Sequence, residues 1–286
     1  MTTPHPPQAV PLPLKGKAGI GERKPVIDLG NFVTRMDLFL LVLVRMSGLF
    51  ILSPIFGRQN MPAIFKIGFS FMLAVIFMNA LPLGTETYFQ NLYQYMVLII
   101  REFAIGLVMG YITYAVMSAI YVAGQLIDTQ VGFGIANVMD PISNIQIPLT
   151  SNFYYIFIIL VFLLLNGHHM LVRALFQSFE AIPVGQFAVT GEFLTLTISV
   201  ITTMFLVAIK ISAPIIAAIF ITDIVLGVLS KTMPEMNVFA LGMPLKIIVG
   251  LLIMMLTVTA AVGIGEGIVS IMEQNLMYLF KTWNGG

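Results

Sequence analysis

The stretch LTLTISVITTMFLVAIKISAPIIAAIFITDIVLGVLS, residues 194–230, decides the fold class of this chain. It is almost wholly apolar and far exceeds the roughly 20 residues that a helix needs to cross the hydrocarbon core of a bilayer. A helix of this length, rising about 1.5 Å per residue, would reach roughly 55 Å. Pro214 lies inside the stretch and predicts a bend, because proline removes a backbone donor and clashes with the preceding turn. We expect a long, kinked helix that packs partly against other protein chains.

Composition places the whole chain in the same class. Of its 286 residues, 58% are hydrophobic and only 9% are charged, and the mean hydropathy is +0.98. Soluble domains carry about 25% charged residues, so a soluble fold of this size is excluded. The chain has no cysteine, which rules out disulfides, thiolate metal sites and cysteine nucleophiles. Its net charge of +1 provides no electrostatic basis for binding nucleic acid.

Several apolar segments of membrane length run along the sequence, and no strand-like alternation competes with a helical interpretation. They cover residues 36–56, 63–82, 94–122, 152–176, 194–230 and 244–281. Loops are expected between them, at 57–62, 83–93, 123–151, 177–193 and 231–243. The run GIGEG is expected to interrupt the last segment. The predicted fold class is an all-α membrane protein with about six long, partly kinked hydrophobic helices or helical hairpins.

The charges of the short loops support two opposite orientations in the membrane. Basic residues in the regions 57–66 and 231–246 predict that both face the cytoplasm, because cytoplasmic loops carry an excess of Lys and Arg. The loops at 83–93 and 177–193 contain acidic residues and no basic ones, which agrees with this assignment. The basic residues of segment 1–28 indicate the reverse orientation, so both stay open.

Lys210 and Asp223 lie deep within the segment 194–230, and Glu266 lies between glycines in the last apolar segment. Each charge costs on the order of 3 kcal/mol in lipid, so these side chains should face protein or water. Lys210 and Asp223 would lie about 20 Å apart on one helix and cannot pair unless the chain folds back. An ion pathway is one interpretation, but secondary transporters usually have repeated halves with paired broken helices. We see no such repeat and favour contacts between subunits.

Other motifs carry weaker signals. The adjacent His168 and His169 point about 100° apart on a helix, so we expect no metal site from them. Gly106 and Gly110 form a GxxxG pair, which permits close approach of a second helix. The sequence has no G-x-S-x-G nucleophile elbow, no P-loop and no GxGxxG after a strand. Nothing in these motifs indicates an enzyme or a cofactor.

A polar, glycine- and proline-rich segment separates two apolar segments: QVGFGIANVMDPISNIQIP, residues 130–148. Gly132 and Gly134 allow backbone conformations that other residues resist, and Asp140-Pro141 favours a turn. Irregular backbone at membrane depth is tolerated only where protein buries it or where it lines a water-filled cavity. Two interpretations stay open: a plain loop at the membrane surface, or a glycine-hinged segment that blocks a pore. In the second, the apolar stoppers are Phe133, Ile135, Val138 and Met139.

A second landmark is LGVLSKTMPEMNVFALGMPLKIIVG, residues 226–250, where the last two apolar segments meet in an expected hairpin. Prolines restrict the turn geometry, and the charged residues should mark a tip that faces water. The tip is either a plain re-entry loop or a docking site for cytoplasmic partners. The residues assigned to it are Lys231, Pro234, Glu235, Gly242, Pro244 and Lys246.

These landmarks, in this order, resemble the FliR family of flagellar export-gate proteins. The resemblance rests on AGQLIDTQVGFGIANVMDP…IP at 123–148, LLLNGHHM at 163–170 and PEMNVFALGMPLKIIVG at 234–250, and it covers about residues 30–281. The SctT-type proteins of injectisomes share the broader layout, but the segment 130–148 looks more similar to flagellar members. An injectisome gate subunit is therefore the second hypothesis, and an ion-coupled secondary transporter is the third.

The resemblance implies a non-enzymatic subunit of the inner-membrane export gate in the flagellar basal body. It would assemble with FliP and FliQ, with FlhB and FlhA nearby, in contact with membrane lipid, and would pass unfolded flagellar proteins. It implies one membrane domain over 29–281, FliP-like at first and ending in a FliQ-like hairpin at 194–281. Segment 1–28 is expected to be a disordered Pro- and Lys-rich tail, and 282–286 a short C-terminal tail. The implied channel plug consists of Gly132, Phe133, Gly134, Ile135, Asn137, Val138, Met139, Asp140 and Pro141.

Overall fold

The structure is a computed structural model that describes residues 36–54, 56–57, 62–80, 91–133, 148–186, 191–235 and 237–284. All regular elements in these ranges are helices, which confirms the predicted all-α class. The helices are α2 (Met36–Leu52), α3 (Ala63–Ala80), α4 (Leu92–Val131), α6 (Leu149–Leu164), α7 (Gly167–Ala181), α8 (Gly191–Thr232), α9 (Val238–Val258) and α10 (Ala261–Asn284). The tail predicted at 1–28 lies outside the described residues.

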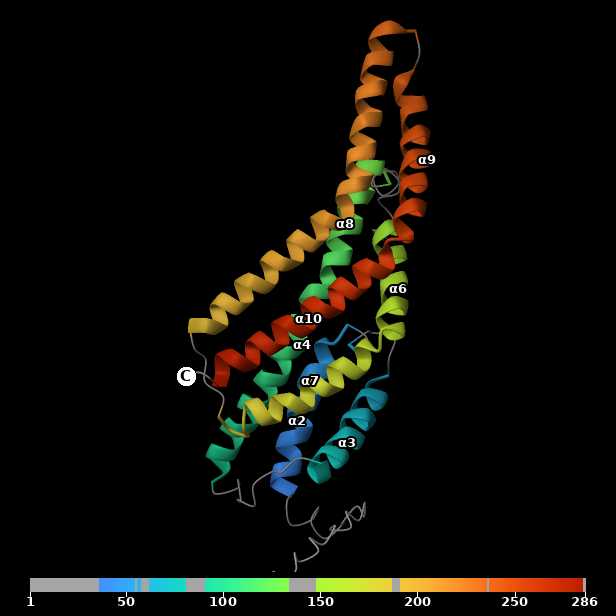
Figure 1. The fold of residues 1–286 in the computed structure, drawn as a ribbon. Helices are drawn as coiled ribbons and strands as arrows, with labels where there is room; N and C mark the ends of the chain where they lie inside the picture. Colours follow the sequence, from blue (N-terminus) through green and yellow to red (C-terminus); the bar gives the residue numbers. More distant parts are fainter. Residues whose placement is uncertain are drawn as a thin grey trace, which may run out of the picture.

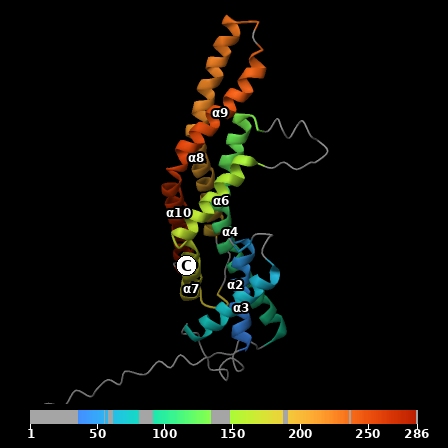
Figure 2. The same cartoon turned by 90° about the vertical axis from the view of Figure 1, so that its right-hand side faces the viewer.

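Helix α4 is the central element of the fold (Figure 1). It packs against α2, α6, α8, α9 and α10. In Figure 1, α2 and α3 lie beside its lower part, whereas α8 and α9 form an antiparallel hairpin that extends beyond its upper end. The side view in Figure 2 shows the same extension. The molecule therefore has a packed lower region and a projecting hairpin.

Three buried clusters follow this arrangement. The first joins α2, α3, α4, α7, the start of α8 and the end of α10. The second joins the last part of α4 to α6, α7, α8, α9 and α10. The third, which is smaller, joins α4 to α8. All three clusters include residues of α4, so this one helix connects the packed region to the hairpin.

Glycines allow α2 and α4 to approach each other very closely. A Cβ atom on Gly106 would lie 2.1 Å from the carbonyl oxygen of Arg45, and one on Gly48 would lie 2.8 Å from that of Phe103. A Cβ atom on Gly110 would also lie 2.9 Å from a backbone oxygen of α2. Any side chain at these positions would separate the helices. The GxxxG pair therefore permits a close helix approach, as its spacing predicts, and the second helix belongs to the same chain.

The helix predicted across 152–176 is broken in the structure. Helices α6 and α7 meet at an angle of 67°. Asn166 stands between them in the left-handed conformation, with φ at 56°, which interrupts a right-handed helix. The following Gly167 is buried, and a Cβ atom there would lie 2.4 Å from the ring of Phe162. The local sequence contains a signal for this turn that the prediction of one helix did not use, since Asn-Gly dipeptides favour turns and two histidines follow.

Two other expected boundaries were wrong. The helix expected at 94–122 continues to Val131, because Ile127 and Val131 are buried against neighbouring helices. The last apolar segment breaks between α9 and α10, at Thr259 and Ala260. The GIGEG run lies inside α10 and does not interrupt it. At the end of α4, tertiary packing overrides the local preference for a loop.

Fewer helices qualify as membrane spans than the sequence predicts. In the described part of the chain, α3, α4, α8 and α9 are long and apolar enough to cross a membrane, and the bent pair α6–α7 can add a fifth span. Helix α2 has only 17 residues. Helix α10 exposes a polar face that includes Glu266, Ser270, Glu273 and Gln274. Helix α2, which corresponds to the predicted segment 36–56, accounts for the difference between six predicted segments and five spans, because segment 244–281 still provides one span in α9.

The hairpin buries little of its own apolar surface. Within the most apolar window of each helix, 28% of α8 and 17% of α9 is buried inside the chain, against 61% of α4. Phe220 is 64% exposed and Met255 is 77% exposed. Helix α8 is bent, as the interior Pro214 predicts (Figure 1). Exposed apolar surface of this extent requires lipid or other protein chains around it.

Candidate functional site

Helix α4 ends directly before most of the predicted plug segment. Its C-cap is Gly132, which adopts the left-handed conformation with φ at 97°. Glycine reaches this conformation without the penalty that a Cβ atom would bring. The Gly132 N–H donates to the carbonyl oxygen of Asp128 at 3.2 Å, which closes the last turn. The glycine predicted to be a hinge therefore also acts as a helix cap.

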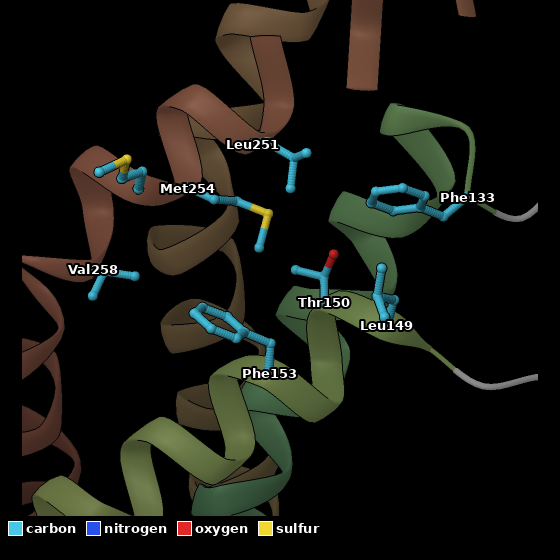
Figure 3. A pocket seen from close by; sticks show the side chains of 8 residues that line it. Phe133, Leu149, Thr150, Phe153, Leu251, Met254 and Val258 are labelled. Carbon is cyan, nitrogen blue, oxygen red and sulfur yellow. The ribbon is translucent and has the colours of Figure 1, made fainter. Parts of the chain in front are cut away.

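Phe133 follows this cap and points into an apolar cavity of about 590 Å³ between α6 and α9 (Figure 3). Among the described residues that line the cavity, Thr150 alone carries a hydroxyl group. Such a cavity can accommodate an apolar side chain or an acyl chain, and these described lining residues include no acid–base or nucleophilic pair. The lining residues are Phe133, Leu149, Thr150, Phe153, Leu251, Met254, Met255 and Val258.

The structure describes the two ends of the polar segment 130–148 and the first two residues of the predicted plug. Phe133 belongs to the plug and Leu149 follows the segment 130–148, and both side chains line the same cavity. The two ends are therefore brought together. The other predicted plug residues lie outside the described residues: Gly134, Ile135, Asn137, Val138, Met139, Asp140 and Pro141.

The three charges predicted to make subunit contacts have different environments. The Asp223 carboxylate forms an ion pair with the ammonium group of Lys246, which links α8 to α9. Asp223 does therefore find a partner in the same chain, and the partner is a residue assigned to the hairpin tip. Lys210 and Glu266 are exposed on this chain and form no ion pair with any described residue. Their contact with other subunits stays a prediction.

The sequence analysis missed the most deeply buried charged pair. Arg45 of α2 and Glu102 of α4 are both 0% exposed, and Arg45 Nε donates to Glu102 Oε2 at 2.6 Å. Both residues fall inside segments that were predicted as apolar spans. Charge within an apolar run was therefore the available signal, although it could not identify the partners.

Arg45 and Glu102 also hold the end of α7. Arg45 Nη1 and Nη2 donate to the carbonyl oxygens of Ser178 and Ile182, at 2.9 Å and 3.0 Å. The guanidinium group lies over the ring of Phe179, 4.1 Å from its centroid. Glu102 Oε1 accepts a hydrogen bond from the N–H of the residue at position 185, at 2.8 Å. The Ser178 carbonyl also accepts the N–H of Ile182 at 2.9 Å, so Arg45 binds the last turn of α7 and the residue that caps it. The Arg45–Glu102 pair therefore joins α2 and α4 to the end of α7.

The predicted docking tip lies at the free end of the α8–α9 hairpin (Figures 1 and 2). Lys231 is exposed in the last turn of α8, and Pro234 and Glu235 are exposed in the connecting turn. Gly242 and Pro244 lie further along, inside α9, where Gly242 is buried against α8. The turn itself is thus shorter than the predicted tip, and its docking role stays a prediction.

The two adjacent histidines lie at the start of α7. The ring centroids of His168 and His169 are 4.2 Å apart, with the rings tilted by 37°. Among the residues that the structure describes, no cluster of three or more His, Cys, Asp or Glu side chains could hold a metal ion. The described geometry around α7 therefore provides no complete metal ligand set.

Known proteins share this sequence over most of its length. The model of the family "Bacterial export proteins, family 1" matches residues 36–272. The flagellar biosynthetic protein FliR of Bacillus subtilis (strain 168) is 34% identical over 254 residues, which cover 88% of this chain and 97% of that protein. FliR of Aquifex aeolicus is 28% identical over 207 residues, or 71% of this chain and 78% of the relative.

A relative from another secretion system is more distant. The Yop proteins translocation protein T of Yersinia pestis is 26% identical over 212 residues, or 73% of this chain and 80% of that protein. The resemblance to the FliR family that the sequence motifs indicate is confirmed by the flagellar relatives. Because the family match extends from the start of α2 into α10, this chain belongs to family 1 of the bacterial export proteins.

Proposed function

We propose that the chain is a structural and gating subunit of the flagellar type III protein export gate. In this role it helps to form the channel through which unfolded flagellar subunits cross the inner membrane. The observation that carries the proposal is the 34% identity to the flagellar biosynthetic protein FliR of Bacillus subtilis over 97% of that protein's length. The role is non-enzymatic: the chain supplies shape, contacts and a barrier to leakage.

The partners in this proposal are FliP and FliQ in a hetero-oligomeric gate, with FlhB and FlhA nearby at the flagellar basal body. The exposed apolar faces of α8 and α9 support an assembly, because an isolated chain would leave most of the hairpin uncovered. We assign the range 194–281 to a FliQ-like part and the preceding helices to a FliP-like part. The pairing of α8 with α9 into a hairpin supports this division.

Co-purification tests the gate assignment. The tagged full-length chain is expressed with the other flagellar export genes and purified in mild detergent. We expect two further small membrane proteins in a constant ratio with it. A stable monomer or homodimer that transports a small solute would overturn the proposal and favour the ion-coupled transporter, with Lys210, Asp223 and Glu266 as its charged residues.

The gating part of the proposal assigns residues 132–141 to a plug. The position of Phe133 and Leu149 on one cavity supports it, because these two residues flank the connection between α4 and α6 that contains most of the predicted plug. Shortening 132–139 should let ions leak across the membrane while the gate still assembles. Unchanged leakage with normal assembly would show that these residues form no plug.

A single substitution tests the glycine in this segment. Gly132→Val should slow export, because valine resists the left-handed backbone that closes α4. Gly227→Val is the matched control, since a Cβ atom at that glycine of α8 meets nothing within 4 Å. Normal motility in the Gly132 variant would count against the hinge.

The injectisome hypothesis is supported only by the more distant Yersinia relative. Complementation separates the two systems. Restored swimming in a flagellated host that lacks its own FliR supports the flagellar gate. Secretion restored only in an injectisome mutant that lacks its translocation protein T would instead favour the virulence gate.

A further inference from the structure

One residue, Asp128, contacts both helix ends that flank the predicted plug segment. Its backbone carbonyl oxygen accepts a hydrogen bond from the Gly132 N–H at 3.2 Å, at the end of α4. Its carboxylate oxygen Oδ1 accepts a hydrogen bond from the Thr150 N–H at 3.1 Å, in the first turn of α6. The sequence separation of the second pair is 22 residues, so Asp128 bridges the whole connection.

The carboxylate satisfies a need that α6 cannot meet by itself. The first N–H groups of a helix have no partners within the helix. The N-cap position of α6 is occupied by Pro148, whose side chain makes no capping hydrogen bond. Asp128 provides from α4 the acceptor that Ser, Asp or Asn would provide at an ordinary N-cap. Its negative charge also lies at the positive end of the α6 dipole.

Packing alone does not explain a carboxylate at this position. Asp128 is only 6% exposed. Its second oxygen, Oδ2, is buried and has no hydrogen-bond partner among the described residues. Burying an ionised group that is only partly satisfied is unfavourable, and an apolar residue would fill the space without this cost. The contact with Thr150 is therefore the feature that a carboxylate adds.

The surrounding contacts set one register for α6 against α4. A Cβ atom on Gly124 would lie 2.4 Å from the Cα atom of Ser151, so the two backbones touch. The Ser151 hydroxyl donates to the carbonyl oxygen of Tyr121 at 3.0 Å. Asp128, Gly124 and Tyr121 thus present one continuous surface of α4 to the first turn of α6.

We propose that Asp128 is a positioning residue, which holds the first turn of α6 against the end of α4. It thereby sets the separation of Phe133 and Leu149, the two points at which the connection is anchored to the cavity. The residue acts as a hydrogen-bond acceptor for the Thr150 N–H, so an uncharged acceptor of the same shape should replace it. The consequence for leakage rests on the proposed gating function, but the position of the helix ends does not.

Spin-label distances test the positioning directly in the purified gate. The chain has no cysteine, so Gln130→Cys and Leu149→Cys place two labels on exposed positions at the two helix ends. We expect a narrow distance distribution in the parent and in Asp128→Asn. In Asp128→Ala the Thr150 N–H loses its acceptor, and the population with a displaced α6 end should rise by roughly tenfold or more.

Thr129→Ala is the matched control. Thr129 is the next residue along α4, is exposed, and its hydroxyl bonds only within its own helix, to Leu126. The distances between the two spin labels in Thr129→Ala should equal those in the parent. If Asp128→Ala does not assemble, Asp128→Ser is measured in its place, because the serine hydroxyl is too short to reach Thr150 and should displace α6 equally.

Leakage of ions through assembled gates is the second measurement. It should rise in Asp128→Ala and stay at the parent level in Asp128→Asn. Parent-like distances in the Ala or Ser variant would overturn the positioning role. An Asn variant that behaves like Ala would overturn the claim that Asp128 acts as a hydrogen-bond acceptor, because the charge would then be the essential property. Displaced helix ends without leakage would support the positioning role and overturn the plug assignment of the proposed function.

Discussion

The region formed by α2, α4 and α7 and the hairpin formed by α8 and α9 are equally helical but are stabilised in different ways. The first contains a fully buried ion pair and glycine contacts between backbones. In the hairpin, the chain buries only 28% of the most apolar window of α8 and 17% of that of α9. The packed region therefore has its position specified by its own chain, whereas the hairpin depends on what surrounds it in lipid or in the gate.

The largest expected effect comes from breaking the buried pair. Glu102→Ala leaves the Arg45 guanidinium uncompensated and should lower the free energy of unfolding by about 3–5 kcal/mol. Unfolding of the purified chain in detergent, followed by circular dichroism during an SDS titration, measures the loss. Replacing both partners, as Arg45→Met with Glu102→Leu, should recover most of it, because no charge is left buried. A double variant as unstable as the single one would contradict this account.

Two neighbouring residues of α8 allow substitutions at a buried and at an exposed position of the hairpin to be compared. Ile219 is 0% exposed and Phe220 is 64% exposed. Ile219→Ala should lower the free energy of unfolding by about 2–5 kcal/mol, because it leaves a cavity. Phe220→Ala should change it by less than about 0.5 kcal/mol in the isolated chain.

For assembly of the gate, we expect the exposed residue to matter, in contrast to its small effect on unfolding. Phe220→Ala should reduce the amount of partner protein that co-purifies, because its exposed ring is available to another subunit. Retained assembly in the Phe220 variant would indicate that lipid, rather than protein, covers this face.

Glycine substitutions should have smaller effects, and they distinguish the close contact of α2 with α4 from an open position in α3. Gly106→Val places atoms against the backbone of α2, since even a Cβ atom would lie 2.1 Å from the carbonyl oxygen of Arg45. Overpacking of this kind should cost about 1–3 kcal/mol, measurable as a lower melting temperature in detergent. Gly68→Ala is the control in α3, where a Cβ atom meets nothing within 4 Å. Equal melting temperatures for the two variants would contradict the close packing of α2 on α4.

The smallest expected effect concerns the ion pair inside the hairpin. The side chains of Lys246 and Asp223 are 26% and 40% exposed. Asp223→Asn should therefore lower the free energy of unfolding by no more than about 1 kcal/mol in detergent. The exchange Asp223→Lys with Lys246→Asp should restore the parent value if the two residues interact only with each other. A full loss of gate assembly in the exchanged variant would show that other subunits also contact them.

Much of the helix pattern could be predicted because it depends on local apolar content. The predicted helix at 194–230 corresponds to α8 (Gly191–Thr232), which is bent as expected from Pro214. The break at Asn166 was not predicted, although Asn166-Gly167 is a turn dipeptide and two histidines follow it. The extension of α4 to Val131 depends on the burial of its last turns against other helices. Hydropathy contains no information about such contacts.

For the candidate site, the sequence indicated individual residues but not the contacts between them. Glycine and proline predicted an irregular segment at 130–148, and the structure places the end of α4 at Val131, with Gly132 as its C-cap, rather than at the expected residue 122. Charges within apolar segments were visible, but the sequence could not show that Asp223 meets Lys246 or that Arg45 meets Glu102. These partners come from different helices, so only the folded chain brings them together.

Composition and local sequence pattern were sufficient to infer that lipid or protein surrounds this chain, that it is helical, and which family it belongs to. A chain with 58% hydrophobic and 9% charged residues is stable only where lipid or protein replaces water. The tertiary structure decided which charges are paired, where helices bend, and that Asp128 of α4 caps the start of α6. Hydrophobicity is a property of each residue and can be read in order, whereas hydrogen bonds and ion pairs need two groups that only folding places within about 3 Å of each other.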